Sequence, residues 1–177
     1  MSEQYFLNCH VILSTYDNDW PKIFDKEKAK ILYVIGGKNV VVEHIGSTAV
    51  PKISAKPIVD IMVGTKDILT SNNCIKPLES IGYEYVPKLE KSFPKRRFLH
   101  KGPNSPNRHF HLHMVKIDSF FWQRQLFFRD YLRKNKDSAI AYQSLKEKLA
   151  KVFVNDVFSY TEAKSDFIQE ILTKCHN

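Results

Sequence analysis

The stretch EHIGSTAVPKISAKPIVDIMV, from Glu43 to Val63, decides which fold this chain adopts. Its two ends belong to apolar, β-branched runs, 40–45 and 58–63, that are typical of buried strands. Between them the chain turns at Gly46-Ser47 and continues through a short segment. The sequence therefore predicts two core strands on either side of a small turn and short helix.

Helix and strand signals continue on both sides of that stretch. A helix is expected to begin at Asp19, which can cap free backbone amides, and to end at Gly36-Gly37. The second core strand is expected to stop at Gly64. The middle of the chain is predicted to hold a helix over 67–81 with a kink at Pro77, short strands at 83–86 and 97–100, and a longer strand at 109–115.

The C-terminal third has a helical pattern. From Ser119 onward the apolar residues recur at spacings of three and four, and the stripe in its second half is assigned to Ala141, Leu145 and Leu149. The last helix is expected to open at Ser159, where the Ser-x-x-Glu spacing suits a capping box. The fold class is therefore α+β in one domain: a mixed sheet of about four to five strands at about 37–117, flanked by helices, and a helical segment at about 118–177.

Composition limits the class of protein. A chain of 177 residues that is 43% hydrophobic can bury a core, so disorder is expected only at the ends. The N-terminus lacks the pattern of a signal peptide, and no apolar run reaches the ~18 residues of a membrane span. The expected location is the cytoplasm, where the three widely spaced cysteines would be reduced thiols.

The formal charge of +8 suggests a nucleic-acid partner, because Lys and Arg attract phosphate backbones. The basic residues are scattered, however, and the densest groups lie at 95–97 and 133–136. The second group falls on an amphipathic helix, where a solvated face explains it. Nucleic-acid binding is therefore the less favoured interpretation of the charge.

The turn Gly46-Ser47-Thr48 is a candidate phosphate site. A strand that ends in Gly-Ser and turns into a short helix offers free backbone amides and two hydroxyls. Lys56, beside the next strand, could contact the same phosphate. The alternative interpretations are a tight turn with a hydroxyl helix cap and a solvated lysine.

Asp60 lies in the middle of an otherwise apolar strand, where a carboxylate is costly unless it is paired, hydrogen-bonded or bound to a metal. It follows the Gly-Ser turn by one short segment, so the two can face each other across adjacent strands. A buried Asp that accepts backbone hydrogen bonds is the alternative. Glu43, near the end of the first strand, is a second candidate for a catalytic carboxylate.

Histidines alternate along the strand predicted at 109–115, so that His109, His111 and His113 share one face. Imidazoles spaced two apart on a strand can hold zinc, manganese or iron, or contact a phosphate. Three histidines on an exposed sheet face are the plain alternative. The aromatic residues at 120–122 and 127–128 fall at helical spacing and are expected in the core.

Taken together, these segments resemble the GrpB family over nearly the whole chain. The matching stretches are Tyr16-Asp17 with Trp20-Pro21, the stretch from Glu43 to Val63, HLHMV (111–115), FRDYLRKN (128–135), AYQSLKEKLA (141–150) and YTEAKSDFI (160–168). This family is placed in the nucleotidyltransferase superfamily with the DNA polymerase beta-like fold, and some of its members are fused to dephospho-CoA kinase.

The resemblance implies a site and a reaction. Gly46 and Ser47 would be the superfamily's Gly-Ser turn, which grips the triphosphate of a nucleotide, and Asp60 would be its first metal carboxylate. The substrate would be a nucleoside triphosphate attacked in line at its α-phosphate. The metal would be Mg²⁺ or Mn²⁺, with Zn²⁺ as a further option because His111 and His113 stand beside Asp60 in the ligand set.

The sequence departs from the superfamily pattern in two places. Active members usually carry a second carboxylate two residues after the first, where this chain has Met62, and His111 and His113 occupy the strand of the third acidic ligand. Two functions therefore stay open: a metal-dependent nucleotidyltransferase with an unknown acceptor, and a catalytically reduced module that binds a nucleotide or a CoA-type ligand. The base preference and the oligomeric state have no signal in the sequence.

Overall fold

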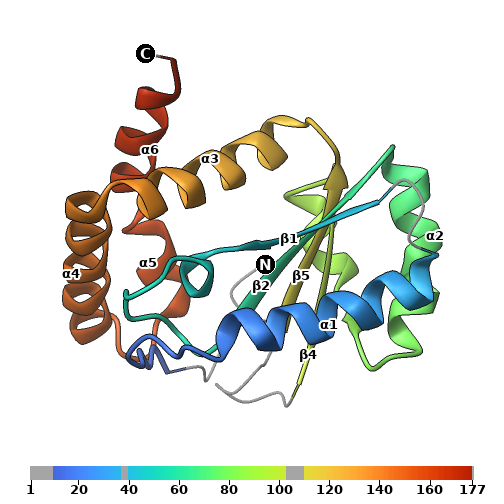
Figure 1. Cartoon of the computed structure of the whole chain (residues 1–177), viewed down its shortest axis with the longest axis horizontal. Coiled ribbons are helices and arrows are strands. Elements are labelled where there is room, and N and C mark those ends of the chain that lie inside the picture. Colours follow the sequence, from blue (N-terminus) through green and yellow to red (C-terminus); the bar gives the residue numbers. More distant parts are fainter. Residues whose placement is uncertain (1–9, 37–39, 103–109, 177) are drawn as a thin grey trace.

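The computed structural model describes residues 10–36, 40–102 and 110–176. Its centre is a five-stranded sheet with helices on both faces (Figure 1). The strands are β1 (Val41–Ile45), β2 (Val59–Thr65), β3 (Glu84–Tyr85), β4 (Arg96–Lys101) and β5 (Phe110–Lys116). The α-helices are α1 (Trp20–Ile35), α2 (Ile68–Glu79), α3 (Phe120–Lys134), α4 (Lys136–Val152), α5 (Val157–Glu162) and α6 (Ser165–Thr173), and the short 3-10 helices are η2 (Ser47–Ala49), η3 (Pro87–Lys91) and η4 (Lys174–His176).

The sheet is mixed, with strand order β1-β2-β5-β4-β3. β2 runs antiparallel to β1 and parallel to β5, and β5 runs antiparallel to β4. The α+β class and the mixed sheet flanked by helices, both predicted from the sequence, are thus confirmed. The register places Asp60 between Ile45 on one neighbouring strand and His111 on the other.

Helices α1 and α2 cover one face of the sheet (Figure 1). Their apolar residues pack against alternate strand residues, which explains the strict alternation along β5. The buried cluster on this face includes Trp20, Phe24, Ile31, Ile61, Val63, Leu78, Leu99, Leu112 and Met114. Asp60, His111 and His113 alternate with these apolar residues along β2 and β5, so they lie on the opposite face.

Helix α3 covers part of that opposite face. Trp122 packs there with Ile45, Met62 and Val115. A Cβ on Gly64 would lie 2.6 Å from the Trp122 ring, so Gly64 lets the helix approach the strand. The expectation that the second strand stops at Gly64 is therefore wrong: β2 continues to Thr65, and the glycine serves packing rather than termination.

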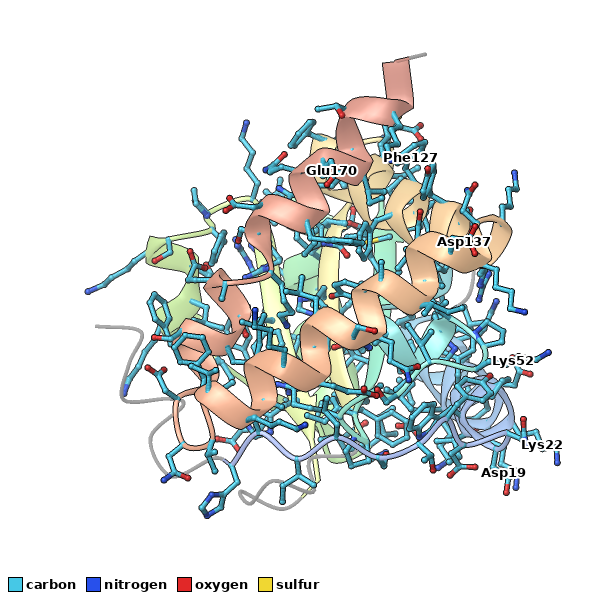
Figure 2. The ribbon with its side chains drawn as sticks, turned by 90° about the vertical axis from the view of Figure 1, so that its left-hand side faces the viewer. Asp19, Lys22, Lys52, Phe127, Asp137 and Glu170 are labelled. Atoms are coloured by element: carbon cyan, nitrogen blue, oxygen red, sulfur yellow. The ribbon has the colours of Figure 1, made fainter. Side chains whose placement is uncertain are left out.

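The C-terminal helices gather at one end of the sheet. Figure 2 turns this side toward the viewer, with α4 and α6 in front of the strands. Val50 and Ile53, which follow the η2 turn, pack against Leu132 of α3 and Tyr142 of α4. The predicted helical segment is present, and its hydrophobic contacts tie it to the loop between β1 and β2.

The first helix starts where the sequence predicts, at Asp19-Trp20-Pro21, but the cap expected there is absent, and the last helix starts elsewhere. Asp19 precedes α1 but makes no side-chain cap; its carboxylate pairs with Lys22 instead, 3.0 Å away (Figure 2). The last predicted helix is in fact two helices, and Ser159 lies inside the first of them. The Asp156 carboxylate caps α5 by accepting from the amide of Ser159, so a better-placed acceptor three residues earlier takes the role expected of Ser159.

The other predicted helices and strands are present with shifted bounds, whereas Phe120, expected in the core, is exposed. The strand expected at 83–86 is reduced to two residues, and the helix expected at 67–81 runs through Pro77 from Ile68 to Glu79. His109 and Gly37 lie outside the described residues. Cys74 and Cys175 are free thiols. Within the described ranges, no helix is both long and apolar enough to cross a membrane.

Candidate functional site

A cleft of about 550 Å³ lies beside the face of the sheet that carries the polar strand residues. Its walls come from β2, β4, β5 and the η2 turn, and from helices α3 to α6. The residues predicted for the site that line this cleft are Gly46, Ser47, Thr48, Lys56, Asp60, His111 and His113. The fold thus brings together residues from three separate parts of the chain.

Gly46 and Asp60 are in direct contact at the base of the cleft. Gly46 ends β1 with φ 71° and ψ −171°, a conformation that side chains disfavour. A Cβ on Gly46 would lie 2.3 Å from Oδ2 of Asp60. The glycine therefore lets the turn approach the carboxylate closely.

Asp60 is paired with a histidine. Oδ1 of Asp60 lies 3.4 Å from Nδ1 of His111 on the neighbouring strand. Burial pushes the pKa of Asp60 upward, but the hydrogen bond and charge of His111, with help from Lys56, hold it below its ordinary value. Among the described residues no main-chain amide donates to this carboxylate, so the structure does not favour the alternative of an Asp held by backbone hydrogen bonds.

His113 lies deeper and is kept neutral. Its ring packs between Phe98 and Phe121, with centroid distances of 5.1 and 6.0 Å. Burial, and then the charge of Arg96, lower the pKa of His113 to about 3. Nδ1 of His113 and Nε2 of His111 are shielded from water and have no hydrogen-bond partner in the described structure. Both nitrogens are free to meet a ligand.

The metal ligands expected from the sequence are near one another but do not form a ready-made cage. In the described part of the chain, no three His, Cys, Asp or Glu residues are arranged to hold a metal ion. Met62, in the position of a second carboxylate, is fully buried against Trp122. The site therefore offers one carboxylate and two imidazoles rather than a set of carboxylates.

Glu43 is held away from the cleft. Its Oε2 accepts from Arg129 at 2.6 Å, and Arg129 also donates to the carbonyl of His44 and to Asp130. Glu43 shares a sheet face with Asp60, since it lies beside Met62 in the register, but it does not line the cleft. This ion pair anchors α3 to β1, a structural role.

The Thr48 hydroxyl is also bonded within the protein. It lies 3.0 Å from Nε2 of His44 and 3.3 Å from the carbonyl oxygen of Ile58. Thr48 is buried, so its side chain fixes the turn against β1 and the start of β2. The other hydroxyl predicted to meet a phosphate, that of Ser47, lines the cleft and is hydrogen-bonded there to the Tyr142 side chain.

The C-terminal helices add two lysines to the cleft that the sequence interpretation missed. Lys146 donates through Nζ to the carbonyl of Ser54, and Lys164 lies with Nζ 4.2 Å from the centre of the Tyr160 ring. Lys56 is 5.6 Å from that ring. Burial lowers the pKa of Lys146 to about 8; burial, and then the charges of Lys56 and Lys146, lower that of Lys164 to about 7. Three lysine side chains, from here on the lysine wall, therefore line one side of the cleft.

One signal could have revealed Lys146. The apolar stripe of α4 was assigned to Ala141, Leu145 and Leu149, whereas its buried residues are Ala139, Tyr142 and Lys146. Lys146 follows Tyr142 by four residues and so shares its face. A lysine on the buried face of a helix is a candidate for function, because such a charge needs a partner.

The class of protein follows from this arrangement of sheet, Gly-Ser turn and strand carboxylate. The fold is nucleotidyltransferase-like. The Cid1 poly(U) polymerase, solved with MgGTP bound, aligns with a TM-score of 0.52 at 10% identity, over 77% of this chain and 44% of that one. Terminal uridylyl transferase 4 of Trypanosoma brucei, with bound CTP, aligns with a TM-score of 0.50 at 12% identity, over 99% of this chain and 54% of that one.

The family is narrower than the fold. The family model described as GrpB protein matches residues 10–174, so the chain belongs to the GrpB family. The crystal structure of GrpB from Enterococcus faecalis aligns with a TM-score of 0.81 at 35% identity, over 92% of this chain and 96% of that one. The glutamate-rich protein GrpB of Alkalihalophilus pseudofirmus is 37% identical over 93% of this chain and 95% of its own length.

A more distant match concerns part of a longer protein. The dephospho-CoA kinase of Mycolicibacterium paratuberculosis is 21% identical over 96% of this chain and 47% of its own length. A GrpB-like region therefore occurs within a larger chain, as the resemblance implied.

Proposed function

We propose that this chain binds a nucleoside triphosphate in the cleft and transfers its nucleotidyl group to an acceptor, with release of pyrophosphate. The observation that carries this proposal is the contact between the Gly46-Ser47 turn and Asp60, inside a cleft with three lysines in its wall. The nucleotidyltransferase-like fold supports it, since neighbours of that fold were solved with nucleotides bound.

The lysine wall suits the triphosphate. Burial lowers the pKa of Lys146 and of Lys164, and the charges of Lys56 and Lys146 lower that of Lys164 further. An anion placed among the three lysines is therefore stabilised by all of them. Ser47 can add a hydroxyl donor to the same phosphates. In this arrangement the α-phosphate lies next to Asp60 and the outer phosphates extend toward α4 and α6.

A divalent metal fits the donor set when it arrives with the nucleotide. Mg²⁺ is usually bound by one or two carboxylates together with substrate phosphates and water, so a cage of protein ligands is not required. Asp60 would hold the metal, and the unpartnered nitrogens of His111 and His113 can take part, with a preference for Mn²⁺ or Zn²⁺ if they ligate directly. When bound, the metal stabilises negative charge on the transferred phosphoryl group.

The transfer itself exchanges one bond for another. An oxygen of the acceptor forms a bond to the α-phosphorus, the bond from that phosphorus to the bridging oxygen of the β-phosphate breaks, and pyrophosphate leaves. A proton on the attacking oxygen passes to the unpartnered Nε2 of His111, whose Nδ1 lies 3.4 Å from Asp60; His113 then remains as the imidazole that can join Asp60 at the metal. Glu43 does not serve as the base, because Arg129 holds it outside the cleft.

The test is a labelling assay with a matched control. Purified protein is incubated with Mg²⁺ or Mn²⁺, α-labelled nucleoside triphosphates and a panel of acceptors, and product and pyrophosphate are measured. Asp60→Asn should abolish turnover, whereas Asp25→Asn, an equal change on the exposed side of α1, should leave it intact. Turnover that survives Asp60→Asn would contradict the proposal.

Binding without turnover is the second candidate function. Met62 is fully buried, so a second carboxylate cannot simply be supplied at that position, and this favours a catalytically reduced module. The match to a dephospho-CoA kinase makes a CoA-type ligand a reasonable probe. Thermal stabilisation by a nucleotide or by CoA, with no product from any acceptor, would select this function over the first.

A further inference from the structure

The cleft has a second basic wall, which the proposed nucleotide site does not use. Arg96 begins β4 and Arg124 lies on α3, and both line the cleft together with His113. They come from β4 and α3, whereas the lysines come from the loop before β2, from α4 and from the residue before α6. The strand order β2-β5-β4 places Asp60 first, the two histidines next and Arg96 beyond them.

Both arginines have a hydrogen-bond donor that meets no partner in the described part of the chain. The Nε atoms of Arg96 and Arg124 are shielded from water and have no hydrogen-bond partner. Within the described ranges, no carboxylate forms an ion pair with either residue; the nearest in sequence to Arg96, Glu90, pairs with Arg97 at 3.1 Å. A buried donor without a partner is costly, and more so when its group is charged.

Arg96 is held in place by aromatic rings rather than by counter-ions. Its guanidinium carbon lies 4.0 Å from the ring centre of Phe93 and 5.2 Å from that of Phe121. Burial lowers the pKa of Arg96 to about 10, which still leaves the group charged at neutral pH. Stacking fixes the plane of the guanidinium and leaves its edge free for two parallel hydrogen bonds, the geometry that suits phosphate and carboxylate.

The lysine wall and the arginine pair lie next to different residues of the site, so they suit different ligand groups. Lys56 is among the charged groups that lower the pKa of Asp60, whereas Arg96 is the arginine that lowers the pKa of His113. An anion held by Arg96 and Arg124 would therefore approach the α-phosphate from across the histidines, away from the lysines that take the triphosphate. That is where the acceptor must stand for an attack opposite the leaving pyrophosphate.

We propose that the acceptor is a small molecule that carries a phosphate or carboxylate group, bound by Arg96 and Arg124. This inference rests on the proposed function and names its second substrate class; the bonds made and broken are those of the transfer step above. A cleft of about 550 Å³ is of the size used for small ligands rather than for a folded nucleic acid. The nucleic acid is therefore an outcome of the test, not the proposal.

The experiment measures binding of three probes by calorimetry: inorganic phosphate, succinate, and a magnesium complex of a non-hydrolysable nucleoside triphosphate analogue. Phosphate and succinate are titrated both into the free protein and into protein saturated with the analogue. The variants are Arg96→Gln, Arg124→Gln and Lys164→Gln. Lys95→Gln is the matched control, since it removes one positive charge from the exposed residue next to Arg96.

In the presence of the analogue, we expect Arg96→Gln and Arg124→Gln each to lower the affinity for the small anion by about tenfold or more, because each substitution removes charged hydrogen bonds. Analogue affinity should stay within about twofold in these variants. Lys164→Gln should weaken binding of the analogue and leave the affinity for the small anion nearly unchanged. Lys95→Gln should change neither affinity. Whichever of phosphate and succinate binds more tightly identifies the anionic group.

Three results would overturn the inference. The first is small-anion binding that depends on neither arginine. The second is a loss of analogue affinity in the arginine variants as large as that in Lys164→Gln. The third is a short single-stranded RNA that binds through Arg96 and Arg124 with higher affinity than the small anions. If the analogue fails to bind while arginine-dependent anion binding persists, the proposed function fails and the anion site stands. Circular dichroism of each variant shows that it is folded, and Arg96→Lys, which keeps the charge, should restore part of the affinity.

Discussion

At the scale of single residues, Gly46 couples the backbone of the turn to the carboxylate of Asp60. Gly46→Ala should disrupt this contact, because the new Cβ would lie 2.3 Å from Oδ2 of Asp60 at a positive φ of 71°. We expect a loss of stability of about 1–3 kcal/mol and a loss of nucleotide-analogue binding. Chemical denaturation and calorimetry measure the two effects.

Gly36→Ala is the matched control for that substitution. Gly36 also has a positive φ, of 81°, but a Cβ there would meet nothing within 4 Å. The control should therefore lose about 1–2 kcal/mol from the left-handed backbone alone and keep its affinity for the analogue. Equal losses of affinity in both variants would show that the contact with Asp60 has no part in binding.

His44 should make the stability of the protein depend on pH. Its ring stacks on Phe24 at 4.7 Å, and burial lowers its pKa to about 4. The unfolded state, with its higher pKa, binds more protons between about pH 6.5 and 4, so the free energy of unfolding falls as pH decreases through that window, by at most about 3 kcal/mol.

Urea unfolding at several pH values measures this effect. In His44→Gln the decrease in stability between about pH 6.5 and 4 should be smaller than in the natural chain. His113, with a pKa near 3 in the fold, contributes in the same direction and remains in the variant, so a residual slope is expected. An unchanged slope would mean that His44 is not kept neutral by the fold.

Residues of the site differ in how visible they are in the sequence. Asp60 is conspicuous because a carboxylate interrupts an apolar strand, and Gly46 because it ends one. Arg96 and Arg124 carry no such signal: they resemble any basic residue on a strand end or an amphipathic helix, and only the packing of α3 over the sheet turns them toward one cleft. Long-range placement of this kind has no local pattern.

At the scale of elements, the two best-defined helix caps in the described structure serve different regions. Asp156 caps α5, which carries Tyr160 into the cleft, and Asp67 caps α2, which lies on the far face of the sheet. Asp156→Ala and Asp67→Ala should each lower the midpoint of thermal unfolding by a few degrees, since each removes a cap.

Only the first of these two substitutions should affect ligand binding. Asp156→Ala loosens the start of α5 and with it the Tyr160 ring that lies beside Lys164, so affinity for the nucleotide analogue should fall several-fold. Asp67→Ala should leave the affinity unchanged. If both variants bind the analogue equally well, α5 does not position the lysine wall.

Elements were predicted well where the local pattern and the packing agree. The runs 40–45 and 58–63 are strands because both of their faces find apolar partners, from α1 and α2 on one side and Trp122 on the other. The break at Ala163 between α5 and α6 was missed because nothing in YTEAKSDFI interrupts a helix by itself. That break sets Lys164 at a helix junction that lines the cleft.

At the scale of the whole molecule, the cleft lies where the C-terminal helices meet the polar face of the sheet, so its charge depends on both parts. The lysine wall has an unusual consequence. Lys164, with its pKa lowered to about 7, is only partly protonated near neutral pH, and an anion placed beside it favours the ammonium form. Binding of the nucleotide should therefore take up protons.

The direction of the pH dependence follows from this linkage. Below about pH 7 Lys164 is already charged in the free protein, so affinity is highest there; above it, each binding event must first gain a proton, and affinity falls by up to about tenfold per pH unit until the pKa of the bound state is reached. Calorimetry in buffers with different heats of ionisation counts the protons. Lys164→Gln should remove most of the uptake, whereas Lys134→Gln, on the exposed side of α3, should keep it. An affinity that is constant over this range, with no proton uptake, would mean that the triphosphate does not lie against the lysine wall. Arg96 and Arg124 would then be the residues that bind the triphosphate.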